Sequence, residues 1–340
     1  MKIKDTVTVY DVAKLAGVST KTVSRVMNDE PTVKEKNKLK VKQAINALGY
    51  RPDVNARRLR TKQSYLIALL YSEFDYNSYS SQLISGAIQT CDVFGYHLLV
   101  RPMNTKATCH IADLIGDIHN SSNPDGYIIA PPLCDNKELI QHLKALEKPC
   151  IRIAPLDIDL SDSIHANEVE PVRKVLHHLI SLGHKDIGFV SNLHGHGGVW
   201  RYQGYQEGLA SAGIAVNDSL VKLKLDIGDA AEIQIRNMLQ MTPRPTAIFA
   251  ATDYLATLIY KVASQMQLHI PYDLSVVGFD DDPYSQNMWP PLSTIRQPIK
   301  ELGKLAAQKL LKQLKPGLPT ANDFALDCEF IQRSSTGPVR

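Results

Sequence analysis

The stretch AGVSTKTVSRVMN, residues 16–28, combines a glycine turn with a dense run of hydroxyl, amide and cationic side chains. A tight turn at Gly17 precedes Ser19 and Thr20. Either hydroxyl predicts the N-cap of a helix that runs to about Asn28, because such side chains satisfy the free N–H groups at a helix start. The helix has more polar side chains than its folding requires, so we expect it to bind a partner.

Apolar residues at helical spacing assign one face of this helix to a small core. Val23, Val26 and Met27 fall at positions i, i+3 and i+4. Similar patterns predict a preceding helix over residues 10–16 and a following one over about 34–48. The inner side of the preceding helix is expected to hold Val12, Ala13, Leu15 and Ala16. The segment therefore reads as three short helices around one core.

Two short helices joined by a glycine turn form a helix-turn-helix, which places its second helix in the major groove of DNA. In that groove arginine can bind guanine through two hydrogen bonds, and short polar side chains can bind bases or phosphates. The outward residues suited to these contacts are Thr20, Lys21, Thr22, Ser24, Arg25 and Asn28. The expected partner is double-stranded DNA.

The distribution of charge supports a nucleic-acid partner. Residues 1–63 contain 15 basic and 6 acidic residues, a net charge of +9, whereas the rest of the chain contains 23 basic and 29 acidic residues, a net charge of −6. A basic segment attached to an acidic body is typical of DNA-binding proteins. The alternative for the basic run alone is a solvated, lysine-rich helix.

Composition excludes several other classes. The chain has 340 residues, of which 44% are hydrophobic and 21% charged, and this suits a globular protein of two or three domains. Its five cysteines are scattered without a C-x-x-C pair, which argues against disulfides and structural zinc. No apolar run reaches membrane-spanning length and no export signal is visible, so we expect no membrane contact and a cytoplasmic location.

From Ser64 onward, apolar runs alternate with amphipathic helices. The runs are YLIALLY, YHLLVRP, GYIIAPP, PCIRIAP, DIGFVSN, LVKLKL, TAIFAAT and LSVVGFDD. Runs of this kind predict parallel strands covered on both faces, and their number favours two α/β lobes. Ligands of such folds bind beyond the carboxyl ends of the strands.

Several segments resemble the lactose-repressor (LacI/GalR) family of bacterial transcription regulators over about 335 residues. They are TVYDVAKLAGVSTKTVSRVMN, GYRPDVNARRL, LGHKDIGFV, RPTAIFAATD, DLSVVGFDD and PPLSTIRQP. The resemblance implies a small all-α helix-turn-helix headpiece and a two-lobed α/β core, periplasmic-binding-protein-like, with parallel sheets. The implied divisions are a headpiece at 1–51, a hinge helix or linker at 52–64 and an effector-binding and dimerisation core at 65–340. Within that core, lobe 1 spans about 65–166 and 297–324, and lobe 2 about 167–296 and 325–340.

By the same resemblance, three residues of the second helix read bases, namely Thr20, Lys21 and Arg25. Four neighbours hold phosphates, namely Ser19, Thr22, Ser24 and Asn28. Leu59 occupies the place of a leucine that the family wedges into the minor groove, where an apolar side chain kinks a base step. The alternative role for Leu59 is helix packing.

The resemblance also implies an effector site between the lobes. Arg201 and Asp280 are expected to face each other across a cleft and to hold a polyhydroxy ligand through charge-assisted hydrogen bonds. The alternative is a salt bridge that closes the hinge. Ser72, Phe74 and Tyr79 follow the first strand of lobe 1 and are further candidates.

Two departures from the family pattern concern the identity of the ligand. Thr252 stands where the family often has asparagine, and Ile227 where it often has an aromatic residue. Trp200 is a candidate to stack on a sugar in its place. Arg152, a cation inside an apolar run, is either a cleft residue or a surface strand residue.

The resulting hypothesis is a homodimeric repressor that binds a palindromic operator and responds to a sugar-like effector, with no cofactor, no metal and no catalytic residue. Whether the effector induces or co-represses is left open, as is a tetramer. The alternatives are an α/β enzyme, for which G-x-G-x-x-G, P-loop and G-x-S-x-G motifs are missing, and a sugar-binding protein without a DNA role. The histidine-rich loop HGHGG lacks carboxylates or cysteines at metal-ligand spacing.

Overall fold

The computed structural model describes residues 7–27, 32–50, 63–72, 78–104, 111–159, 161–192, 196–225, 228–315 and 326–340. The chain divides into two compact units, residues 1–64 and residues 65–340. Leu59 and the other residues of the expected hinge up to Lys62 lie outside the described ranges, as do Asn28, Phe74 and Ile227.

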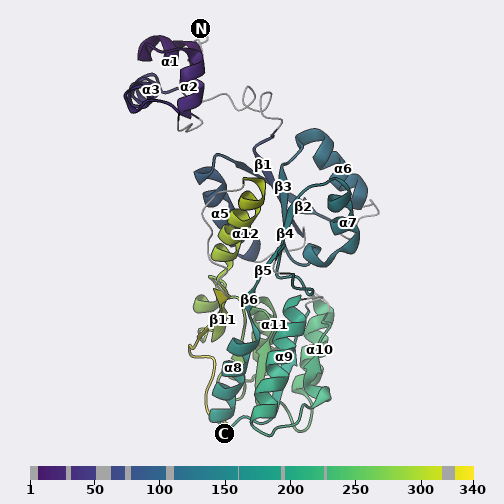
Figure 1. Ribbon diagram of the computed structural model, residues 1–340. Coiled ribbons are helices and arrows are strands. Elements are labelled where there is room, and N and C mark those ends of the chain that lie inside the picture. The colour runs from purple at the N-terminus through teal and green to yellow at the C-terminus, as the bar shows by residue number, and fades with distance from the viewer. Residues whose placement is uncertain are drawn as a thin grey trace, which may run out of the picture. The chain divides into compact units, whose positions relative to one another are not determined.

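The first unit contains three helices around one small core. They are α1 (Val9–Ala16), α2 (Thr20–Met27) and α3 (Glu35–Leu48). Gly17 has a φ of 63°, the left-handed conformation that lets the chain turn sharply between α1 and α2. The core residues are Val12, Ala13, Ala16, Val23, Val26, Val41 and Ala44, with Met27 packed against them. The expected helix-turn-helix is therefore present (Figure 1).

One predicted core residue of α1 is on the surface. Leu15 is 56% exposed, although Val12, Ala13 and Ala16 are buried as expected. A helix of eight residues turns only one narrow stripe toward its neighbours. That stripe is centred on Val12 and Ala16, and Leu15 lies outside it.

The second unit contains two α/β lobes, each built on a parallel sheet. Lobe 1 has the strand order β2-β1-β3-β4-β5 and lobe 2 the order β10-β9-β7-β8. The strands of lobe 1 are β1 (Leu66–Ser72), β2 (His97–Met103), β3 (Gly126–Ile129), β4 (Cys150–Ile153) and β5 (Ser163–Ile164). Those of lobe 2 are β7 (Ile187–Val190), β8 (Val221–Lys222), β9 (Ala247–Ala250) and β10 (Ser275–Val277). Each strand coincides with one of the predicted apolar runs, which β1 and β2 exceed by one residue, except β5, which was not predicted.

Helices cover both faces of each sheet, which explains why the strands are almost continuously apolar. Lobe 1 carries α5 (Ser78–Val93), α6 (Ile111–Ser122), α7 (Lys137–Ala145) and α12 (Ile299–Leu314). Along β1, Ile67 and Leu69 pack on the side of α5 and α12, whereas Ala68 and Leu70 pack on the side of α6 and α7. Lobe 2 carries α8 (Val169–Ser181), α9 (His196–Ser211), α10 (Asp229–Leu239) and α11 (Asp253–Gln265).

The chain returns to lobe 1 after completing the sheet of lobe 2. Figure 1 shows α12 beside α5, and the two helices approach closely because glycines face the opposing backbone. A Cβ atom on Gly86 would lie 1.9 Å from the carbonyl oxygen of Lys300, and one on Gly303 would lie 2.1 Å from that of Leu83. Only glycine permits this separation of the helices.

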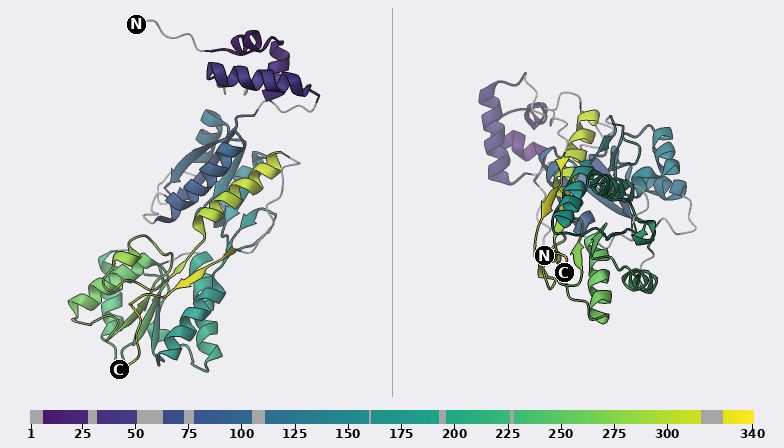
Figure 2. Two further views of the ribbon diagram at one scale, coloured as in Figure 1. Left: turned by 90° about the vertical axis from the view of Figure 1, so that its left-hand side faces the viewer. Right: turned by 90° about the horizontal axis from the view of Figure 1, so that it is seen from below.

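Short strand pairs lie at the junction of the lobes, as Figure 2 shows. They are β6 (Ala166–Asn167) with β12 (Leu326–Asp327), and β11 (Thr294–Arg296) with β13 (Glu329–Ile331). The 3₁₀ turns are η1 (Leu133–Asp135), η2 (Asp218–Leu220) and η3 (Ser285–Asn287). The chain crosses this junction repeatedly, so several separate backbone segments link the two lobes.

Candidate functional site

The second helix of the headpiece begins at a side-chain cap. Ser19 Oγ accepts a hydrogen bond from the backbone N–H of Thr22 at 3.1 Å and lies 2.9 Å from the Thr22 hydroxyl. Of the two predicted capping residues, Ser19 therefore performs the role, since it satisfies an N–H group with no partner inside the helix.

Packing of Val23 and Val26 into the core orients α2. Lys21 and Arg25 are exposed, and three hydroxyl residues are half-buried along the same helix, namely Thr20, Thr22 and Ser24. The helix thus presents two cations and several hydrogen-bonding groups away from the core. This surface is suited to the edges and phosphates of a DNA duplex.

In lobe 2, polar residues follow the carboxyl ends of three neighbouring parallel strands. Asn192, Thr252 and Asp280 come shortly after β7, β9 and β10. Parallel strands end at the same edge of the sheet, where open α/β folds bind ligands. This edge is the candidate effector site.

Arg201 is the central cation of the site. It belongs to α9 and is only 5% exposed. Its Nε donates to the Glu168 carboxylate at 2.8 Å, and its Nη1 donates to the backbone oxygen of Ala251. The guanidinium carbon lies 3.5 Å from the centre of the Phe279 ring, and Nη2 lies 3.9 Å from Asp280 Oδ1. These contacts hold the guanidinium in one orientation.

Asp280 is buried and held in an unusual backbone conformation. It is 6% exposed, has a φ of 122°, and accepts a hydrogen bond from Gln297 Nε2 at 2.7 Å. Burial raises the pKa of Asp280 well above its ordinary value, although the Arg201 guanidinium opposes this shift. Strained, buried carboxyl groups at strand ends are typical of functional sites.

The expectation that Arg201 and Asp280 face each other across a cleft is wrong, because the two side chains are in contact. Both residues belong to lobe 2, on α9 and after β10, and they approach each other within that lobe. The reason is that Phe279 packs in the core that α9 covers, so the next residue, Asp280, emerges beside Arg201. The salt bridge that was the alternative exists, but it joins parts of one lobe.

The other predicted effector residues occupy varied positions. Thr252 is buried, and its hydroxyl caps α11 by accepting from Leu255 N–H at 3.2 Å. Trp200 is half-buried, with its ring edge-on to His165 at 5.5 Å between centres. In lobe 1, Ser72 is buried at the end of β1, and Tyr79 packs against the core from α5. Phe74 lies outside the described residues.

A chain of hydrogen bonds crosses from lobe 1 to lobe 2. Gln82 Nε2 donates to Ser78 Oγ at 3.1 Å, and the Ser78 hydroxyl donates to Asp282 Oδ1. The backbone N–H of Asp282 then donates to Asp253 Oδ2 at 2.8 Å, and the Thr294 hydroxyl donates to Asp253 Oδ1 at 2.6 Å. Burial raises the pKa of Asp253 to about 7. A change in the separation of the lobes would break this chain at Ser78.

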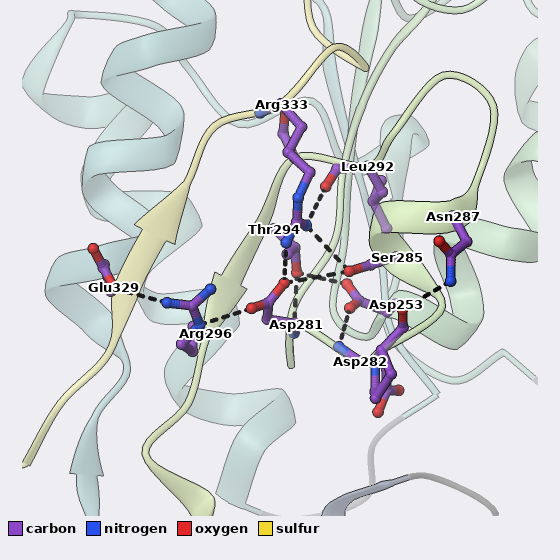
Figure 3. A network of polar contacts seen from close by, with 12 residues as sticks. Asp253, Asp281, Asp282, Ser285, Asn287, Leu292, Thr294, Arg296, Glu329 and Arg333 are labelled. Atoms are coloured by element: carbon purple, nitrogen blue, oxygen red, sulfur yellow. Dashed lines mark hydrogen bonds and ion pairs between the residues drawn. The ribbon is translucent and has the colours of Figure 1, made fainter.

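A neighbouring carboxylate is neutralised by two arginines. Asp281 binds Arg333 Nη2 at 2.5 Å and Arg296 Nε at 2.7 Å, and Arg296 also reaches Glu329 (Figure 3). Burial tends to raise the pKa of Asp281, but the two guanidinium groups hold it below its ordinary value. This network joins the loop after β10 to the last strands of the chain.

Sequence reasoning missed several residues of the site. Glu168, Asp253, Asp282 and Gln297 were not predicted, although Asp282 extends the acidic run after β10 and Gln297 lies in a quoted motif. Glu168 precedes α8 in an unremarkable polar segment. No local pattern marks it, because its partner Arg201 is 33 positions away.

Arg152 is not a surface residue. It is 7% exposed on β4, and its Nη2 binds Asp162 at 2.8 Å. The strand lies between β3 and β5, so neighbouring strands shield it on both sides. Of the two alternatives, the surface strand is excluded.

Among the described residues, no group of three or more histidine, cysteine, aspartate or glutamate side chains is arranged to hold a metal ion. In the same part of the chain, no helix has the length and apolar character needed to cross a membrane. The histidine-rich loop falls partly outside the described ranges.

Comparison with known proteins gives matches for both units of the chain. Residues 8–53 match the model of bacterial regulatory proteins of the lacI family, and residues 176–336 match that of periplasmic binding protein-like domains. The ribose operon repressor of Haemophilus influenzae is 32% identical over 332 residues, which cover 96% of this chain and 98% of the relative.

Solved structures agree with these matches. The lac repressor dimer bound to operator and the anti-inducer ONPF has a TM-score of 0.74 and 28% identity, covering 98% of this chain and 100% of that one. The complex of the transcriptional regulator CelR with cellobiose has a TM-score of 0.72 and 25% identity, covering 97% of this chain and 99% of that one. The likeness extends through the headpiece and both lobes.

Proposed function

The chain belongs to the lacI family of bacterial regulatory proteins, and on this premise we propose that the edge of lobe 2 at Arg201 and Asp280 binds the effector of a dimeric repressor. The protein is a DNA-binding transcriptional regulator, and membership of this family argues against the enzyme alternative. Names of relatives include a ribose operon repressor and a cellobiose complex, which support a sugar as the class of effector. We place its action in the cytoplasm, where operator DNA is located.

Recognition of DNA is assigned to the second headpiece helix. Arg25, Lys21 and Thr20 would read base edges, and Ser19, Thr22 and Ser24 would contact phosphates. Two headpieces are needed to meet the two halves of a palindrome, as in the solved lac repressor dimer on its operator. Asn28 and Leu59 keep their proposed contacts with phosphate and minor groove.

The observation that carries the effector site is the buried Arg201, held between Glu168 and Asp280 at the carboxyl edge of a parallel sheet. An effector changes operator affinity only if it binds two arrangements of the lobes unequally. The hydrogen bond from Ser78 of lobe 1 to Asp282 of lobe 2 exists in one such arrangement. A ligand at this edge is therefore positioned to favour one arrangement over the other.

The test begins with DNA selected from a random-sequence pool and with a thermal-shift screen of neutral, cationic and anionic monosaccharides. A ligand at 100 times its Kd stabilises the folded protein by about 2.7 kcal/mol. The measured quantity is the ratio of operator affinities with and without that sugar, which we expect to be about 5–150.

Asp280→Asn keeps the size of the side chain but replaces one accepting oxygen by an amide group that can only donate, so we expect that ratio to approach one. The matched control is Asp218→Asn, at the turn η2 away from the strand ends, and it should keep the ratio of the parent protein. An Asp280→Asn protein that responds at the same sugar concentration as the parent would show that the effector binds elsewhere.

A further inference from the structure

The candidate effector site contains more buried carboxyl groups than cations. Glu168, Asp253, Asp280 and Asp282 are 3%, 0%, 6% and 1% exposed, and Arg201 is the guanidinium among them. Burying several carboxyl groups without matching positive charge is costly. The raised pKa values of Asp253 and Asp280 reflect this shortage, since burial favours their neutral forms.

Three other cations among the described residues are engaged elsewhere. Arg296 and Arg333 both bind Asp281. Lys309 donates to the backbone oxygen of Ser163 at 3.2 Å. The imidazole of His165 lies near Glu168, and burial lowers its pKa, which favours the neutral ring. Among the described residues, one guanidinium, that of Arg201, therefore faces the carboxylates of Glu168 and Asp282, while burial favours the neutral forms of Asp253 and Asp280.

Two acceptor atoms at this edge have no hydrogen-bond partner within the described ranges. Asp282 Oδ2 is buried and has no such partner, although Oδ1 of the same carboxylate accepts from Ser78 and the Tyr284 hydroxyl lies near this carboxylate. Asn192 Oδ1, directly beyond β7, is also buried and unpaired. Burying an acceptor without a donor is unfavourable, so each oxygen is suited to a donor supplied by a ligand.

An anionic ligand is disfavoured at this site. The Nε side of Arg201 is bound to Glu168, and its Nη2 lies near Asp280. A carboxylate or phosphate approaching the guanidinium would be repelled by the like charge of Glu168 and would find the Nη2 side already occupied by the Asp280 carboxyl group. The described carboxylates also form no metal-binding group, so an inorganic ion is not indicated as the missing cation.

We propose, building on the proposed effector site, that the effector is a polyhydroxylated amine of monosaccharide size, an amino sugar. Its ammonium group supplies a positive charge beside Glu168 and Asp282, and on binding it favours the ionised form of Asp280. Its hydroxyl groups donate to the unpaired oxygens of Asp282 and Asn192. Trp200 contacts His165, which lies near Glu168, and is the aromatic residue proposed to pack against the sugar ring.

The test compares ligands that share one skeleton and differ in charge. Calorimetry on the full-length protein measures Kd for glucosamine, glucose, glucuronate and glucose 6-phosphate, and for galactosamine, galactose and galacturonate. In at least one series the amine should bind tenfold or more tightly than its neutral parent, a difference of about 1.4 kcal/mol, and the anions should bind most weakly.

Two isosteric variants test which carboxylates cause the preference for an amine over a neutral sugar. Glu168→Gln and Asp282→Asn should each lower the preference for amine over neutral sugar about tenfold, because each removes one negative charge facing the ammonium group. The matched control is Glu170→Gln, two residues along, whose carboxylate is 45% exposed and pairs with Arg173. This control should keep the preference of the parent protein.

The outcomes separate this inference from the proposed function. A neutral or anionic sugar that binds as tightly as the amine and changes operator affinity would overturn the amine proposal and leave the effector site standing. An unchanged preference in both isosteric variants, with unchanged thermal unfolding, would also overturn it. At ligand concentrations of about 10 mM, even a binding free energy of about 3 kcal/mol is detectable. If none of the seven sugars binds under these conditions, the result would count against the amine proposal.

Discussion

Replacing Asp253 by asparagine should make the protein more stable at neutral pH than it is now. Asp253 is fully buried, and its two oxygens accept hydrogen bonds from Asp282 N–H and the Thr294 hydroxyl. An asparagine can keep both contacts, since its oxygen accepts from Asp282 N–H and its amide donates to Thr294. The substitution therefore removes a charge and little else.

The magnitude follows from the pKa of Asp253, which rises from an ordinary 3.8 to about 7 on folding. Between these values the folded protein holds a proton that the unfolded chain has released, so stability falls as pH rises through this window. A shift of about 3 units at about 1.4 kcal/mol each amounts to about 4 kcal/mol. Asparagine has no such dependence, and the variant should gain up to this amount relative to the parent between about pH 4 and 8.

The assay is urea unfolding at several pH values, followed by tryptophan fluorescence at one protein concentration. Both tryptophans, Trp200 and Trp289, belong to lobe 2, so the signal reports the lobe that contains Asp253. Asp117→Asn, an exposed position of α6, is the matched control. The contribution of Asp280, also raised in pKa, is present in both proteins and largely cancels in the difference.

The difference in unfolding free energy between the Asp253 variant and the parent should grow with pH. A difference that stays constant within about 1 kcal/mol from pH 4 to 8 would refute the reasoning, because a titrating group must change it over that range. A growing difference in the control would show that the effect is not specific to the buried carboxyl.

Other predictions concern DNA and packing. Arg25→Ala should weaken binding to the selected operator by about 1–3 kcal/mol per half-site without changing thermal unfolding, and unchanged protection of the same DNA would contradict the assignment of α2. If about six to ten phosphates are contacted, operator affinity should fall about 10³–10⁵-fold between 50 and 200 mM salt, and a flat titration would contradict the charge argument. Gly86→Ala should destabilise lobe 1 by about 1–3 kcal/mol, because its Cβ would collide with the Lys300 carbonyl. Gly116→Ala on α6, which has open space around it, should instead stabilise by up to about 1 kcal/mol, and equal effects of the two substitutions would exclude this packing account.

Local features of the chain determined much of the fold. The spacing of Val23 and Val26 located the second headpiece helix, because a helix repeats its buried face every three or four residues. Runs such as TAIFAAT located strands, since a strand covered on both faces is apolar throughout. Arg201 and Asp280 were expected through the resemblance of their segments to family motifs, each as a separate residue.

The composition of the effector site was decided by the tertiary structure. Glu168 lies 33 positions before Arg201, and Asp282 lies 204 positions after Ser78, yet both pairs are in contact. Arg201 and Asp280 are in contact because Phe279 packs in the core that α9 covers, and Leu15 is exposed because it lies outside the narrow stripe of α1 that is buried. Such pairings depend on which strands and helices become neighbours in the assembled core. Short-range periodicity along the chain does not predict those neighbours.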